Sequence, residues 1–359
     1  AICSEIAGIC STCAVLAVRE KVAAFSNAAR QAITIAAPVL ERRALNGAIR
    51  RCHGDLHLAN LVVWQGRPTP FDALEFSEEM ATVDTLYDLA FLLMDLEHYH
   101  QRDAANVVFN RYLWRQGMVE ELDGLLALPL FLACRAGIRA LVAVQRAKVA
   151  GHDDAALNEC AAAALRYLDD AIAYLAPQTP RVIAIGGLSG SGKTTLAAAL
   201  APLVGRAPGA LHLRSDLERK AMMGVEETVR LPAHSYTAES AHAVYERVFA
   251  RAAASLAAGH SVVVDAVFST QSERRRIADI ARQAGARFDA IWLQASPEVL
   301  KSRVAERTGD ASDATPEVVE RQLHQAVGPL DWQIMETTGA PGTIAAAATE
   351  LLHLAPHSD

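Results

Sequence analysis

Hydrophobic positions along the chain follow two patterns, one before about residue 177 and another after it. In the first part, apolar residues recur at the spacing of amphipathic helices. One helix is predicted over residues 5–45, broken at Pro38, and further helices over 85–100, 104–117, 126–149 and 155–175. A polar loop at 53–60 and two short strands, 61–64 and 69–74, are predicted between the first helix and the others. The first part is therefore expected to be mainly helical.

A different pattern begins after the proline-containing linker at 176–180. Short apolar runs now alternate with helical segments, and strands are predicted at 182–185, 211–213, 261–264 and 290–293. Such alternation is typical of a parallel sheet with crossover helices. We therefore predict two domains: residues 1–177, mainly helical, and residues 181–345, an α/β domain with a parallel sheet and flanking helices.

Composition limits the classes of partner. Of the 359 residues, 52% are hydrophobic and 21% charged, which fits two globular domains. The net charge is −7 and acidic residues outnumber basic ones in both parts, so no nucleic-acid partner is expected.

Cysteine usage and hydropathy bear on the compartment. Six cysteines in a chain of this length are too few for a disulfide framework, which favours the reducing cytoplasm. Arg135 and Arg139 interrupt the longest apolar stretch, residues 125–144, and no membrane partner is expected. The sequence begins at Ala1 instead of Met, so we expect it to be part of a longer protein.

The strand predicted at 182–185 runs into a full G-x-x-x-x-G-K-[ST] motif that is followed by a predicted helix. Its glycines let backbone N–H groups face phosphate oxygens, and the helix adds its positive end. Lys193 is expected to reach the β- and γ-phosphates of ATP, and the Thr194 hydroxyl to bind Mg²⁺. The predicted cofactor-binding residues are Gly187, Ser189, Gly190, Ser191, Gly192, Lys193, Thr194 and Thr195. The alternative is a glycine-rich turn that holds no ligand.

Two aspartates follow later predicted strands. Asp216 comes after the strand at 211–213, where it could deprotonate an acceptor hydroxyl; it could also cap the next helix. Asp265 directly follows the run 261–264, where a carboxylate would orient Mg²⁺, with a strand-end cap as the alternative.

Basic residues near the predicted site are candidates for binding phosphate. A helix predicted over 300–307 places Arg303 and Arg307 on one face, where they could close over the transferred phosphate. A solvated basic face is the alternative. Arg219 lies one turn beyond Asp216.

Residues 181–330 resemble the small-molecule P-loop kinases, an AAA-type ATPase group that includes gluconate kinase, adenylylsulfate kinase, chloramphenicol phosphotransferase and zeta-toxin-like enzymes. The resemblance implies that Asp216, in its D-x-x-R element, is the catalytic base and that Arg219 binds substrate. It also implies that Lys193, Arg303 and Arg307 are catalytic. The segment 312–314 and Gln322 are similar to the ending of one subgroup of predicted kinases.

A second motif, Cys52-His-Gly-Asp-Leu-His-Leu-Ala-Asn60, stands in the first part, with Asp72 on the predicted strand that follows. It has the chemistry of a kinase catalytic loop: Asp55 accepts a hydroxyl proton, and Asn60 and Asp72 bind Mg²⁺. It resembles the aminoglycoside phosphotransferase family, which implies that Asp84 and Asp88 brace the loop. About 50 residues precede the motif and offer no glycine-rich loop or strand lysine. Residues 1–177 are therefore expected to be a kinase C-lobe, truncated or inactive.

Together the two resemblances imply a bacterial fusion of a phosphotransferase-like domain with a P-loop kinase domain. The expected function is ATP- and Mg²⁺-dependent phosphorylation of a hydroxyl on a small polar acceptor such as a sugar, amino sugar or aminoglycoside. A polynucleotide-end kinase and a non-catalytic ATP-binding scaffold are the competing hypotheses.

Overall fold

The computed structural model describes residues 16–149, 154–307 and 309–354. The chain forms two compact units, the first made of residues 1–105 and 124–177 and the second of residues 106–123 and 178–359. The predicted division differed in one respect, because it left residues 106–123 in the first domain. Asn106 shows why they group with the second unit: its Nδ2 donates to the carbonyls of Pro208 and Ala210, each over 3.0 Å.

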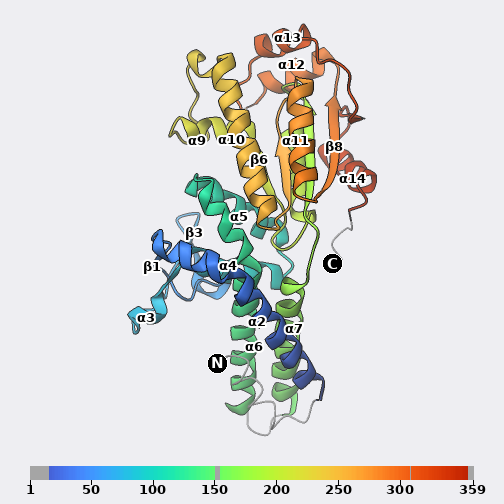
Figure 1. Cartoon of the computed structure of the whole chain (residues 1–359). Coiled ribbons are helices and arrows are strands. Elements are labelled where there is room, and N and C mark those ends of the chain that lie inside the picture. Colours follow the sequence, from blue (N-terminus) through green and yellow to red (C-terminus); the bar gives the residue numbers. More distant parts are fainter. Residues whose placement is uncertain (1–15, 150–153, 308, 355–359) are drawn as a thin grey trace. The chain divides into compact units, whose positions relative to one another are not determined.

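The first unit is mainly helical (Figure 1). Its long helices are α2 (Leu16–Leu45), α4 (Thr85–His98), α6 (Leu128–Val149) and α7 (Asp154–Leu175), and α6 packs along both α4 and α7. The break predicted at Pro38 is wrong, since α2 continues through it. Ala36 and Val39 on either side are buried, so packing compensates for the hydrogen bond that proline cannot make. Residues 5–15 of that predicted helix lie outside the described residues.

Two small antiparallel pairs accompany these helices: β1 (Ile49–Arg51) with β4 (Thr82–Asp84), and β2 (Leu61–Trp64) with β3 (Arg67–Pro70). The 3₁₀ turn η1 (Leu58–Asn60) precedes β2, and the short helix α3 (Glu78–Ala81) precedes β4. The strand predicted over 69–74 is wrong beyond Pro70. The N–H of Phe71 still donates to Asn60, but Asp72 has a left-handed φ of 59°, which turns the chain out of the strand.

Helix α6 is long and apolar enough to cross a membrane by length and composition alone. Two-thirds (67%) of its most apolar window is buried inside the structure, and a buried core helix passes the same test. Ala133, Ala136 and Ala140 on this helix are fully buried.

The second unit contains a five-stranded parallel sheet with strand order β6-β7-β5-β8-β9. The strands are β5 (Arg181–Gly187), β6 (Leu211–Arg214), β7 (Val262–Asp265), β8 (Arg287–Gln294) and β9 (Gln333–Glu336). The four predicted strands are confirmed, and β9 was missed. The α/β class predicted for this part of the chain is likewise confirmed.

Helices cover both faces of the sheet. α8 (Lys193–Leu200) and α14 (Pro341–Leu351) pack on one face with buried residues of β5, β7 and β8, including Ile183, Val263 and Ile291. α10 (Ala238–Ala257) and α11 (Gln271–Gln283) pack together on the other face (Figure 1). The remaining helices near the site are α9 (Ser215–Met222), α12 (Pro297–Ala305) and α13 (Pro316–Leu323), and α5 spans Arg102–Gln116.

The parallel register brings the ends of three strands together. Ile185 of β5 and Arg214 of β6 are both paired with Asp265, the last residue of β7. Because the carboxyl ends of parallel strands share one edge, the loops after β5, β6 and β7 converge there.

Candidate functional site

The loop between β5 and α8 needs its glycines. Gly190 has a φ of 85°, and a Cβ on it would collide with the carbonyl of Leu300. Gly192 has a φ of 92° and is the N-cap of α8, which begins at Lys193 as the motif predicts. The loop therefore presents the start of a helix to the strand edge, an arrangement that suits phosphate.

Lys193 bends back over this loop, and its Nζ donates to the carbonyl of Leu188 over 3.0 Å. Burial lowers the pKa of its ammonium, while the charges of Asp265 and Asp216 act in the opposite direction. Of the other predicted loop residues, Ser191 is buried and Thr195 is exposed.

Thr194 and Asp265 meet where β5 and β7 end. The Thr194 hydroxyl donates to Oδ2 of Asp265 over 2.5 Å. Burial works to raise the pKa of Asp265, but His212, Lys193 and Arg214 around it lower that pKa below its ordinary value. His212 Nε2 lies 3.7 Å from Oδ2, an electrostatic contact and too long for a hydrogen bond.

These two oxygen ligands fit Mg²⁺, which prefers hard oxygen donors and usually takes only one or two carboxylates beside substrate phosphates. Within the described ranges, no group of three or more His, Cys, Asp or Glu side chains is placed to hold a metal ion. An ion at Thr194 and Asp265 would therefore depend on a phosphate-bearing ligand for the rest of its coordination.

Asp216 lies in the first turn of α9, where the N-cap is Arg214, so the capping alternative for Asp216 is wrong. Burial, followed by the neighbouring charge of Asp265, raises the pKa of the Asp216 carboxyl. A carboxylate with a raised pKa beside a P-loop suits proton transfer.

Arg214 is a charged neighbour of the site that sequence reasoning missed. Its Nη2 donates to Asp310 over 2.8 Å, and its Nε lies 3.9 Å from Oδ2 of Asp265. Asp310 also faces Arg307, with 3.5 Å between Nε and Oδ2. The position of Arg214 at a strand end beside Asp216 was the available signal.

Arg303 and Arg307, which were predicted to close over the transferred phosphate, do not share a helical face. α12 ends at Ala305, so the helix predicted through Arg307 is wrong. Arg303 joins α12 to the residue after β9 and to the P-loop. Its Nη2 donates to the Thr337 carbonyl over 2.5 Å, and its Nη1 lies 3.5 Å from the Gly190 carbonyl. Arg307 lies beside Asp310, and its positive charge contributes to lowering the pKa of Lys193.

Arg219 contacts the chain between α9 and α10. Its Nη1 donates to the Ser235 carbonyl over 2.8 Å and to the Ser240 hydroxyl over 2.9 Å, and its guanidinium lies 4.8 Å from the centre of the Tyr236 ring. The substrate-binding role of Arg219 stays a prediction.

Asp313 fixes the same segment from the other side. Its Oδ2 accepts hydrogen bonds from Lys220 (2.8 Å), the Leu231 N–H (2.9 Å) and the Tyr236 hydroxyl (2.5 Å). Lys220 is only 1% exposed and Asp313 9%. Asp313 thus joins α9, the segment before α10 and the chain after α12.

A cavity of about 860 Å³ opens beside the loop that follows Asp265. α10, α11, the loop between β7 and α11, and residues 325–326 line it, with polar contributions from His242, Glu246, Thr270, Glu273, Arg276 and Gln325. Phe268 in that loop is fully buried with a left-handed φ of 53°. Tyr245 Oη accepts its N–H over 2.8 Å, and Arg274 Nη1 donates to its carbonyl over 2.7 Å. Backbone strain of this kind persists only where the surroundings hold it, often at functional sites.

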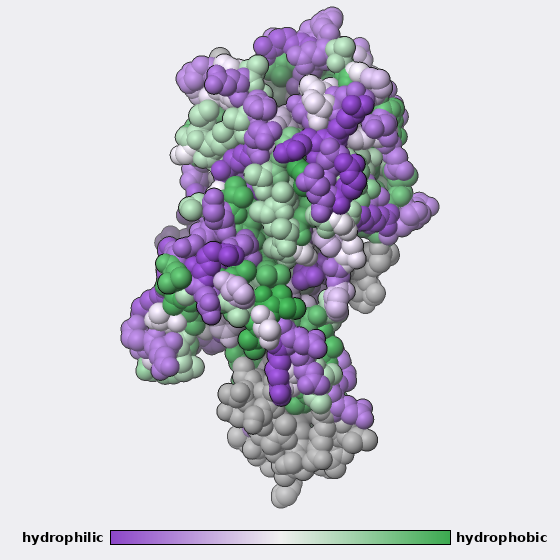
Figure 2. All heavy atoms as spheres, in the orientation of Figure 1, coloured by the Kyte–Doolittle hydropathy of each residue, from purple (hydrophilic) through white to green (hydrophobic). Residues whose placement is uncertain are grey.

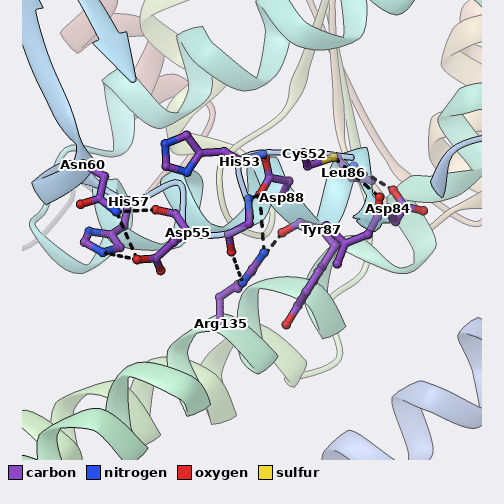
Figure 3. A network of polar contacts seen from close by, with 12 residues as sticks. Cys52, His53, Asp55, His57, Asn60, Asp84, Leu86, Tyr87, Asp88 and Arg135 are labelled. Atoms are coloured by element: carbon purple, nitrogen blue, oxygen red, sulfur yellow. Dashed lines mark hydrogen bonds and ion pairs between the residues drawn. The ribbon is translucent and has the colours of Figure 1, made fainter. Parts of the chain in front are cut away.

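In the first unit, the predicted catalytic loop gathers three of its polar side chains. Asn60 Nδ2 donates to the carbonyl of Asp55 over 2.9 Å and to its Oδ2 over 3.1 Å. His57 Nε2 lies 3.4 Å from the same Oδ2. Figure 3 shows Asp55, His57 and Asn60 on one side of the loop. Asp72 follows β3 instead of lying on a strand, and its side chain is exposed.

Asp88 and Arg135 hold the other part of this loop, at residues 53–54 (Figure 3). Asp88 accepts the N–H groups of His53 (3.1 Å) and Gly54 (2.8 Å), which confirms its expected bracing role. Arg135 Nη1 donates to the Gly54 carbonyl over 3.2 Å. Asp84 instead caps α4 and forms a buried two-point ion pair with Arg43.

Comparison with known proteins gives a family match within the second unit and a longer match to curated relatives. Residues 182–329 match the family model described as an AAA domain. Uncharacterised proteins from Mycobacterium tuberculosis and Mycobacterium bovis are 31% identical over 280 residues, which is 77% of this chain and 54% of theirs. The chain thus spans about half the length of the curated relatives it matches.

Solved structures that resemble part of this chain include three kinases, each covering 49% of it. A sugar kinase from Janibacter sp. is 22% identical over 96% of its length, with a TM-score of 0.36. A gluconokinase from Sinorhizobium meliloti is 22% identical over 97% of its length, with a TM-score of 0.32. The APS kinase of Mycobacterium tuberculosis is 17% identical over 99% of its length, with a TM-score of 0.35. Motif, strand order and family match together identify residues 182–329 as a P-loop domain of the AAA type.

Proposed function

We propose that the protein is an ATP- and Mg²⁺-dependent phosphotransferase whose acceptor is a hydroxyl of a small polar molecule, and that the P-loop unit carries the reaction. The contact between Thr194 and Asp265 at the start of α8 is the observation that carries this proposal. Phosphoryl transfer from ATP requires Mg²⁺ beside the P-loop lysine, and a hydroxyl and a carboxylate next to Lys193 are suitable ligands for it.

Each residue has a distinct part in the proposed transfer. The N–H groups of the loop and Lys193 bind and orient the β- and γ-phosphates. Mg²⁺, held by Thr194 and Asp265, would neutralise charge on those phosphates. Asp216 takes the proton of the acceptor hydroxyl. The acceptor oxygen bonds to the γ-phosphorus while the bond from that phosphorus to the β,γ-bridging oxygen breaks and ADP leaves. Arg307 supplies positive charge near the transferred group.

The cavity beside Phe268 is the proposed acceptor site. Its volume of about 860 Å³ is that of a small-molecule pocket. Its lining contains hydroxyl, carboxylate, imidazole and amide groups together with the rings of Tyr245 and Phe249. Such a lining suits a molecule rich in hydroxyl groups, so we expect a sugar, an amino sugar or an aminoglycoside-like acceptor in the cytoplasm.

The first unit supports a second candidate activity. Asp55 and Asn60 are in direct contact, and Asp88 and Arg135 hold their loop in place. Phosphoryl transfer at Asp55, with Asn60 and Asp72 as Mg²⁺ ligands, would follow kinase logic. The aminoglycoside phosphotransferase resemblance stays a prediction for this unit.

The test is direct detection of a phosphorylated acceptor by mass spectrometry after incubation with ATP and Mg²⁺. The panel contains sugars, amino sugars, aminoglycosides and nucleosides, with a DNA oligonucleotide for the polynucleotide-end alternative. A product made by the wild type and by Asp55→Asn but not by Lys193→Ala supports the proposal. ATP binding with no product from any acceptor would favour a regulatory scaffold.

A further inference from the structure

The P-loop contacts a side chain from far along the chain. The backbone N–H of Ser189 donates to Oε1 of Gln322 over 2.9 Å, across a separation of 133 residues. Gln322 lies in the last turn of α13. Nothing in the Walker A motif itself calls for this partner.

The contact lies at one particular end of the loop. Lys193 Nζ donates to Leu188, the residue immediately before Ser189. In a Walker A motif this ammonium reaches the β- and γ-phosphates. The Ser189 N–H is therefore at the γ-phosphate end of the loop, and Gln322 is there with it.

Apolar packing fixes the helix that carries Gln322. Leu300 and Val304 of α12 form a buried cluster with Val319 of α13, and Leu188 of the P-loop and Leu323 pack against it. α12 and α13 lie side by side in Figure 1, and the visible surface over them is mostly hydrophilic in Figure 2. Leu188, next to Ser189, and Leu323, next to Gln322, thus pack against the same apolar cluster, which fixes the position of Gln322 relative to Ser189.

A glutamine at this position has a second function to offer. Its carboxamide carries an acceptor oxygen and an NH₂ group with two donors. The oxygen is used by Ser189, while Nε2 makes no hydrogen bond within the described part of the chain. The NH₂ group can therefore donate to an oxygen of the γ-phosphate, which ATP carries and ADP lacks.

We propose that Gln322 contacts the γ-phosphate: Oε1 fixes the Ser189 N–H and Nε2 donates to a γ-phosphoryl oxygen, so that Gln322 distinguishes ATP from ADP. This inference rests on ATP binding at the P-loop, which the proposed function also requires. It assigns a ligand contact to α13, outside the G-x-x-x-x-G-K-[ST] motif.

The experiment compares dissociation constants for ADP and for a non-hydrolysable imido analogue of ATP, measured by calorimetry with Mg²⁺. Gln322→Glu keeps the shape and an acceptor for Ser189 but replaces the donor with a negative charge. Gln322→Met removes both polar groups at similar length. Gln283→Glu, which adds the same charge at an exposed position of α11, is the matched control.

We expect Gln322→Glu to weaken binding of the ATP analogue roughly tenfold or more, as loss of a charged hydrogen bond does, and to change ADP binding by less than about threefold. Gln283→Glu should change neither. Equal weakening for both nucleotides would overturn the inference and leave Gln322 as a support for the loop, and unchanged binding of both would overturn it too.

Failure of the proposed function gives a different result. If the wild type discriminates the two nucleotides through Gln322 yet phosphorylates no acceptor, the inference stands and the phosphotransferase proposal falls. If the wild type binds neither nucleotide, the inference and the phosphotransferase proposal both fail. They also both fail if Lys193→Ala binds the two nucleotides as tightly as the wild type does. Circular dichroism of each variant checks that the P-loop unit remains folded.

Discussion

The Thr194 hydroxyl and the Asp265 carboxylate are joined by a hydrogen bond of 2.5 Å although 71 residues separate them in the chain. Strands β5 and β7 are neighbours in parallel register, so the residue after the P-loop lysine meets the last residue of β7. This contact defines where an Mg²⁺ ion would lie relative to the loop.

Asp265→Asn should raise the Mg²⁺ concentration needed for half-maximal turnover and lower kcat by about 100-fold, since an amide is a weaker ligand and carries no charge. The measurement is ATP turnover across a range of Mg²⁺ concentrations. Asp279→Asn, which removes a carboxylate from the exposed surface of α11, is the control and should leave both values unchanged. Normal Mg²⁺ dependence in Asp265→Asn would mean that Asp265 only positions Thr194.

Asp216→Asn should retain ATP binding and lose phosphoryl transfer. A base must be ionised to accept a proton, and the Asp216 pKa is raised above its ordinary value of 3.8. In the wild type, kcat/KM for the acceptor should therefore fall as pH decreases through that raised pKa. The pH–rate profile measures this, and a variant that loses nucleotide binding instead would give Asp216 a structural role.

Tyr245→Phe should raise the KM for the acceptor by several-fold and leave the KM for ATP unchanged. The lost hydroxyl is the acceptor for the N–H of Phe268, whose buried left-handed backbone shapes the cavity wall. An unpaired buried N–H costs about 1–3 kcal/mol, enough to let the loop relax. Equal changes in both KM values would argue against the cavity as the acceptor site.

Asp313→Asn should destabilise the P-loop unit by about 3 kcal/mol at neutral pH, because it leaves the buried Lys220 ammonium without its counter-charge. The exposed pair of Asp279 and Arg282 offers the contrast, and Asp279→Asn should cost less than about 1 kcal/mol. Thermal unfolding of both variants measures the difference. Similar losses for the two would show that Asp313 contributes no more than a surface charge.

The same pair gives a pH dependence with a definite sign. Burial opposes ionisation of Asp313, but hydrogen bonds from Lys220, Tyr236 and the Leu231 N–H lower its pKa below the ordinary 3.8. A carboxyl with a lowered pKa stabilises the fold fully above its unfolded-state pKa, and loses that contribution as pH falls through the lowered value. The stability gap between wild type and Asp313→Asn should therefore shrink below about pH 4.

Local sequence patterns were sufficient to predict much of the fold and part of the candidate site. The buried strands β5 and β7 stand out as apolar runs, and the P-loop glycines mark the turn before Lys193. Strand β9 was missed because its four residues are largely exposed and carry little apolar pattern. The break expected at Pro38 failed because packing of neighbouring residues outweighs the one hydrogen bond that proline removes.

Contacts that depend on tertiary structure could not be found in this way. The hydrogen bond between Ser189 and Gln322 joins residues 133 positions apart, and no local sequence pattern predicts it. The strained φ of Phe268 depends on Tyr245 and Arg274, which approach from α10 and α11. Arg307 was misplaced because helical spacing alone gives no sign that α12 stops at Ala305.

Acceptor-stimulated release of ADP by the wild type, Lys193→Ala and Asp55→Asn tests the central claim most directly. The account predicts that one acceptor of the panel stimulates the wild type and Asp55→Asn alike, and that Lys193→Ala shows no stimulation. Stimulation that survives Lys193→Ala and disappears in Asp55→Asn would contradict the account and move the reaction to the first unit.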